Sequence, residues 1–202
     1  MPPKPKFTRE EVVEVALKLV AEKGLTALTA RELGERLGSS ARPIFTAFRN
    51  MEELTEAVRE AAMQKYDAFV GVAENYSPVF KAFGVRMVLF AAQEPKLFQL
   101  LFMRENQNEA DFTVVSNLLG PTRELCIDAI MQDYGLSKDD ARAFFEPMWI
   151  YTYGLAVLCA TGMCHFDEDT ICVMLGREFM GMMSLMKSGR WNQPTPYPTE
   201  KD

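Results

Sequence analysis

The sequence has little of the equipment that enzymes need. Its 202 residues include one histidine, His165, and four cysteines, none of them in a C-x-x-C pair. It has no G-x-S-x-G, P-loop or G-x-G-x-x-G stretch, so no nucleophile elbow or phosphate-binding loop is indicated. The spacing of the cysteines around His165 matches no familiar zinc pattern. We therefore expect no enzyme, no catalytic residue, no metal and no cofactor, and we leave a redox role of the cysteines open.

Long apolar runs are scarce as well. The amino terminus has no stretch of signal-peptide type, and residues 147–166 are a run of 20 residues without aspartate, glutamate, lysine or arginine. That run contains Pro147, Gly154 and His165, which favours a buried helix over a membrane span. Cysteines in apolar surroundings are typical of reduced thiols. We expect a cytoplasmic protein that makes no membrane contact.

The acidic excess is unevenly distributed. The chain carries 22 basic and 28 acidic residues, a net charge of −6. Residues 1–50 hold nine basic and six acidic side chains, a net charge of +3, and the remainder holds 13 and 22, a net charge of −9. A basic amino-terminal segment on an acidic body suggests a surface that faces nucleic acid.

Helix signals dominate the chain. No alternating strand pattern or hairpin dipeptide is present, and the sequence predicts an all-α fold. Capping sequences mark four helix starts, at Thr8-x-x-Glu11, Thr29-x-x-Glu32, Asn50-x-x-Glu53 and Ser137-x-x-Asp140. The predicted helices cover residues 8–23, 29–37, 40–48, 50–75, 77–94, 96–104, 111–134 (with a break at 120–121), 137–163 and 167–187.

Two of these helices have helix-turn-helix spacing. The stretch L-T-A-R-E-L-G-E-R-L-G-S-S-A-R-P-I-F-T-A-F, residues 28–48, places two short helices around the tight turn 37–40. In such a motif the second helix presents its amino-terminal side chains to base edges in the major groove. We expect Arg42 in the first turn of that helix. The alternative is an ordinary helical hairpin in a bundle.

The flanking residues resemble the TetR/AcrR family of bacterial transcription regulators. The phrase V-V-E-V-A-L-K-L-V-A-E-K-G (residues 12–24), the segment T-A-R-E-L-G-E-R-L-G-S-S and the ending F-R-N-M-E-E-L are similar to the family's first four helices. The resemblance covers residues 8–54, about a quarter of the chain. Phe45, Ala47 and Met51 depart from the tyrosine, polar residue and lysine that are common there, and Pro43 lies inside the expected recognition helix.

From this match we predict the residues that contact DNA. They are Thr29, Ser39, Ser40, Arg42, Thr46 and Arg49, and Lys4 and Lys6 in an amino-terminal arm are further candidates.

The resemblance implies that the remaining helices bind a ligand and form a dimer. Many large apolar side chains in this half suit a cavity for a flat apolar or amphipathic molecule. The candidate ligand-binding residues are Phe83, Arg86, Met87, Phe90, Phe102, Trp149 and Tyr153, and Arg86 would suit an anionic group. The last two long helices carry small residues and methionines all round, which favours a homodimer interface.

The expected organisation has three parts: a helix-turn-helix domain (1–54), a larger helical ligand-binding and dimerisation domain (55–190) and a mobile tail (191–202). The expected function is that of a repressor that binds a palindromic operator in double-stranded DNA as a dimer and is released by a small effector. The alternative is a helical dimeric small-molecule-binding or interaction protein with weakened DNA binding.

Overall fold

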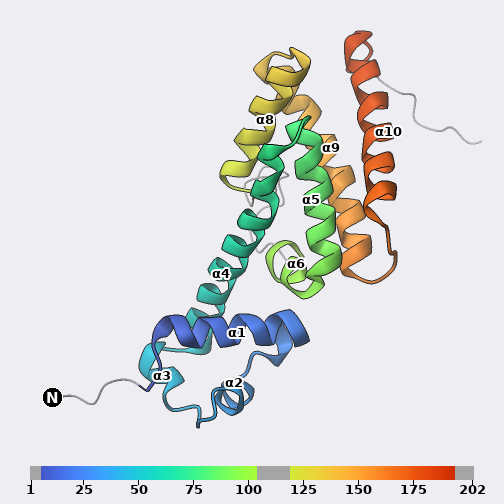
Figure 1. The fold of residues 1–202 in the computed structure, drawn as a ribbon. Coiled ribbons are helices and arrows are strands. Elements are labelled where there is room, and N and C mark those ends of the chain that lie inside the picture. The colour runs from blue at the N-terminus through green and yellow to red at the C-terminus, as the bar shows by residue number, and fades with distance from the viewer. Residues whose placement is uncertain (1–5, 104–118, 194–202) are drawn as a thin grey trace, which may run out of the picture.

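The structure, a computed structural model, describes residues 6–103 and 119–193 and consists of helices (Figure 1). Their bounds are α1 (Arg9–Lys23), α2 (Ala30–Arg36), α3 (Ile44–Ala47), α4 (Met51–Gly71), α5 (Val79–Gln93), α6 (Pro95–Phe102), α8 (Pro121–Tyr134), α9 (Lys138–Ala160) and α10 (Glu168–Lys187), with short 3-10 helices η1 (Leu25–Ala27) and η2 (Val72–Asn75). No strand occurs within these two described ranges, which confirms the all-α prediction.

The helices form two regions. We call residues 6–54 the head, and residues 55–103 and 119–193 the body. In Figure 1 the head, with α1, α2 and α3, lies at one end, and α4 runs from it into the body, where α5, α6, α8, α9 and α10 pack together. The rest of the chain lies outside the described residues, including Lys4, positions 111–118 of the seventh predicted helix and most of the predicted tail.

Side-chain caps fix most helix starts where the sequence predicts them. Thr8 and Glu11 form a reciprocal capping box at the start of α1. The side chains of Thr29, Asn50 and Ser137 each accept a hydrogen bond from the backbone N–H three residues later. Because a cap pairs N–H groups that the helix itself leaves free, it determines the first residue of each helix.

The recognition helix is the main correction to the predicted elements. It was expected over residues 40–48 with Arg42 in its first turn, but α3 covers only Ile44–Ala47 and Arg42 lies in the turn before it. Pro43 immediately precedes the first residue of α3, and a proline disfavours helical angles in the residue before it. The proline therefore delays the helix start beyond Arg42.

The turn between α2 and α3 depends on two glycines. A Cβ atom on Gly34 would come within 3.1 Å of the backbone of Ser40 and Ala41, so only glycine lets the turn pack this closely on α2. Gly38 has a φ of 61°, a left-handed conformation that suits glycine. These residues set the angle at which α3 leaves the turn.

The body has an apolar core that is rich in aromatic rings. Phe90, Phe98 and Phe144 are fully buried, and Tyr66 of α4 makes edge contacts with Phe90 and Phe102 at centroid distances of 5.2 and 4.9 Å. One described helix, α9, is long and apolar enough to cross a membrane by length and composition alone. Half of its apolar window is buried inside the folded chain, which is also typical of a core helix.

Candidate nucleic-acid interface

The predicted DNA-contacting residues gather on the outer side of α2, the turn and α3. Ser40, Arg42 and Thr46 are exposed, and the Thr46 hydroxyl lies 3.5 Å from the Arg42 carbonyl oxygen. The Ser39 hydroxyl accepts a hydrogen bond of 3.1 Å from the ammonium of Lys6, which places Lys6 beside the turn. A polar surface with an exposed guanidinium is what phosphate and base contacts need.

Two predicted contacts also have structural roles. The Thr29 hydroxyl caps α2 by accepting a 3.2 Å hydrogen bond from the Glu32 backbone N–H. The Arg49 side chain is 89% exposed, yet its Nε lies 3.2 Å from Glu53. Both side chains lie at the edge of the candidate interface while stabilising the fold of the head.

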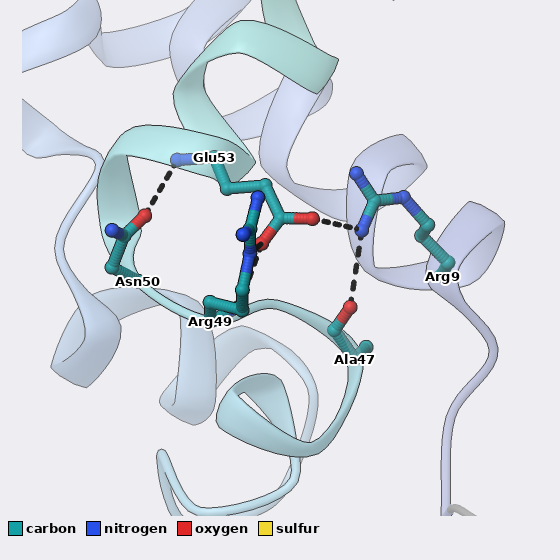
Figure 2. Close-up of polar contacts among 5 residues, drawn as sticks. All are labelled: Arg9, Ala47, Arg49, Asn50 and Glu53. Carbon is teal, nitrogen blue, oxygen red and sulfur yellow. Dashed lines mark hydrogen bonds and ion pairs between the residues drawn. The ribbon is translucent and has the colours of Figure 1, made fainter.

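Glu53 joins three elements of the head (Figure 2). Its Oε1 accepts a hydrogen bond of 2.8 Å from the Arg9 guanidinium, which also donates to the Ala47 carbonyl oxygen at 3.1 Å. Its Oε2 accepts from the Arg49 backbone N–H at 2.8 Å, and its own N–H donates to Asn50. Glu53 thus ties the end of α3 to the starts of α1 and α4.

The charge of Glu53 is strongly favoured at this position. The Arg49 backbone N–H, followed by the Arg9 and Arg49 guanidinium groups, lowers the pKa of the Glu53 carboxyl to about 2. Arg9 is further held by Phe48, whose ring centroid lies 4.1 Å from the guanidinium carbon. The capping pattern predicted Glu53 only as the partner of Asn50; its partner Arg9 lies 44 positions away and gives no local signal.

Phe45 is the apolar residue on this surface. It is 47% exposed, whereas its neighbour Ile44 is fully buried. The α3 helix therefore presents a ring together with Thr46, where the related family commonly has a tyrosine.

The body contains a cavity of about 40 Å³ between α4, α5, α8, α9 and α10. Three predicted ligand-binding residues line it: Phe83, Met87 and Trp149. Other lining residues that sequence reasoning did not single out for this role include Lys81, Cys126, Met148 and Phe179. Their positions depend on which side of each helix faces inward, and a helix that is apolar on several faces does not show this in its sequence.

The other four predicted ligand residues lie elsewhere. Phe90 and Phe102 are buried among the rings between α4 and α6. The Tyr153 hydroxyl donates to the Phe102 carbonyl oxygen at 2.8 Å. Arg86 donates from Nε to the Phe69 carbonyl oxygen at 3.0 Å, and its guanidinium lies over the Phe69 ring.

Within the described residues, no group of three or more histidine, cysteine, aspartate and glutamate side chains is placed to hold a metal ion. Burial raises the pKa of the Cys126 thiol to about 12 and also raises that of Cys159. A raised pKa disfavours the thiolate that reacts with oxidants and metals.

Sequence comparisons relate the head to known DNA-binding regulators. Residues 12–58 match the family described as "Bacterial regulatory proteins, tetR family". A stretch of 58 residues is 38% identical to the tetracycline repressor protein class C of Escherichia coli; it is 29% of this chain and spans about a quarter, 26%, of that relative. A crystal structure of a Streptomyces coelicolor A3(2) protein, assigned as a transcriptional regulator, is similar over 94% of this chain and 87% of its own, with 18% identity and a TM-score of 0.44.

The head is a helix-turn-helix domain of the kind that bacterial regulators use to bind DNA. Residues 12–58 are the part of the chain that is similar to the TetR family of bacterial regulatory proteins.

Proposed function

We propose that the protein is a transcriptional repressor in the cytoplasm that binds a palindromic operator as a homodimer and releases it when a small apolar or amphipathic effector occupies the body. The observation that carries this proposal is the exposed surface around α3, with Ser40, Arg42 and Thr46, on a domain that matches a DNA-binding family. One similar protein is named a tetracycline repressor, which supports repression rather than activation of transcription.

The dimer is supported by exposed apolar side chains on α9 and α10. Ile150, Val173 and Met180 are 54%, 49% and 63% exposed, and a Cβ on Gly154 or Gly181 would meet no atom within 4 Å. Exposed apolar side chains beside open glycines allow two helices to approach closely. A two-fold partner would cover these side chains and present two heads to successive major grooves, about 34–36 Å apart.

Effector control is supported by the path of α4. This helix carries Glu53 at its head end and Tyr66 at the cavity, so one rigid element touches both. A ligand that binds two orientations of α4 with different affinity shifts the balance between them by that difference.

Selection of bound fragments from the source genome by the purified protein, at one stated salt concentration, tests the proposal. Enrichment of one inverted repeat is the expected result. A folded dimer that enriches no fragment would contradict it and would support the alternative, an interaction protein with weakened DNA binding, which the departures at Phe45, Ala47 and Met51 favour.

A further inference from the structure

Lys81 adds a positively charged group to the lining of the cavity in the body, which the sequence did not indicate. Among the lining residues that the structure describes, Lys81 alone carries a charge; most of the others are aromatic or aliphatic. A partly buried ammonium beside an apolar cavity loses hydration and gains when an anion replaces the lost water.

Lys81 lies where α5 packs against α10, a line of contact that we call the seam. Its ammonium lies 3.8 Å from where a Cβ atom of Gly176 would be, and one turn along α5 a Cβ on Gly84 would come within 3.3 Å of the Leu175 side chain. The two helices are therefore in close contact beside Lys81. The Lys81 ammonium therefore lies beside Gly176 of α10.

Lys81 also lines a second, more open cleft of about 250 Å³, to which α5 and α10 contribute residues as well. That cleft contains Arg86 and a single carboxylate, Glu168. Within the described residues, neither Lys81 nor Arg86 lies within 4.0 Å of a carboxylate oxygen. Arg86 is held against Phe69 and lines only the open cleft. Lys81 is the cation that lines both the cavity and the cleft, among the residues that the structure describes.

We propose that the effector is an amphipathic anion: its apolar part occupies the aromatic cavity, and its carboxylate or similar anionic group pairs with Lys81 at the seam. This inference rests on the proposed function, since it names the class of effector for that cavity. The anchor lies at Lys81, about one turn before the Arg86 that the sequence suggested.

The cavity must widen to accept such a ligand. Its present volume of about 40 Å³ is far below that of a small organic molecule. Met87 and Met148 line it, and methionine side chains adapt their shape readily. We expect the apolar part to displace these two side chains.

Trp149 provides a direct readout, because it lines the cavity. In a Trp191→Phe background Trp149 is the only tryptophan, since the chain has two. We would titrate this protein with decanoate, 1-decanol and decyltrimethylammonium, below their micelle concentrations, and follow Trp149 fluorescence. Decanoate should bind about tenfold more tightly than 1-decanol, as expected of a hydrogen bond to a charged group. The decyltrimethylammonium cation should bind most weakly.

The variant Lys81→Met should bring the decanoate-to-decanol ratio close to one, whereas Lys81→Arg should retain the preference. Lys187→Met, at an exposed position of α10, is the matched control and should leave the ratio unchanged. A melting curve confirms that each variant is folded. Equal binding of acid and alcohol by the parent, failure of both to bind, or an unchanged ratio in folded Lys81→Met would each overturn the inference.

This test is separate from that of the proposed function. The fluorescence ratio requires no DNA, so it can support the anionic site even if no operator is found. A gel shift with the selected repeat then asks whether decanoate releases DNA. Lys81-dependent binding without release would leave the site in place and contradict effector control.

Discussion

The head and the body both have apolar cores, but they differ in the other side-chain contacts that link their helices. In the head, ion pairs link separate helices: Arg36 with Glu22, Lys23 with Glu32, and Arg9 with Glu53. In the body, ring pairs link separate helices, such as Tyr66 of α4 with Phe90 of α5 and Phe144 of α9 with Phe179 of α10. The described head has no ring pair, and its exposed ring, Phe45, lies on the candidate DNA surface. The comparison teaches that the same substitution should have different effects in the two regions.

Loss of a ring tests this difference most strongly. Phe98 is fully buried and contacts the rings of Phe102 and Tyr153, so Phe98→Ala should lower the free energy of unfolding by about 3–5 kcal/mol. Phe45→Ala, with a ring that is 47% exposed, should change it by about 0.5 kcal/mol or less. Urea unfolding measures both, and similar losses would show that the exposed ring of Phe45 contributes to the stability of the head as much as a buried ring does to that of the body.

A charge on the outer face of the body should disrupt the proposed dimer. Met180→Asp places a carboxylate on a side chain that is 63% exposed on α10, and we expect the dimer dissociation constant to rise about a hundredfold. Val72→Asp, at a 39% exposed position away from α9 and α10, is the control. Sedimentation equilibrium measures both, and an unchanged dimer in Met180→Asp would refute this interface.

Loss of an exposed arginine should weaken DNA binding when the arginine lies in the head, but not when it lies in the body. Arg42→Ala should weaken operator binding by about 1–3 kcal/mol if the guanidinium contacts a base. Arg142→Ala removes an equally exposed arginine from α9 and should leave the affinity unchanged. Fluorescence anisotropy at one salt concentration compares them, and equal losses would mean that Arg42 has no specific contact.

The smallest expected effect concerns ion pairs. Glu53→Gln should weaken operator binding by about fivefold, since α3 loses part of its attachment while the core stays intact. Glu94→Gln removes the partner of Lys65 in the body and should not change DNA binding. An equal loss in both variants would contradict a special role for Glu53.

The pH dependence of Glu53 has a definite sign. Its pKa falls from 4.5 to about 2 in the folded head, so ionised Glu53 stabilises the folded state. That contribution is complete above pH 4.5 and is lost as the pH falls toward 2. Acid unfolding of wild-type protein should therefore show a component between these values that Glu53→Gln lacks.

The sequence predicted most where contacts are local. Thr8, Asn50 and Ser137 cap residues three positions away, so a short pattern located their helices. Pro43 was visible too, but its effect on the start of α3 depends on the competition between local geometry and packing.

Distant contacts could not be predicted in this way. Glu53 meets Arg9 across 44 positions, and Lys81 of α5 lies beside Gly176 of α10, 95 positions away. The residues of α5 are apolar on several faces, so the sequence suggested Arg86 as the candidate for an anionic group and did not single out Lys81. Their roles depend on how α4, α5 and α10 pack.

The central claim is that two heads bind one palindromic site. Anisotropy titrations should compare the selected inverted repeat with a single half-site and with a scrambled duplex, at the same salt concentration. The account predicts that two protomers bind the repeat together, far more tightly than one protomer binds the half-site. Equal affinity for the repeat and the scrambled duplex would contradict it.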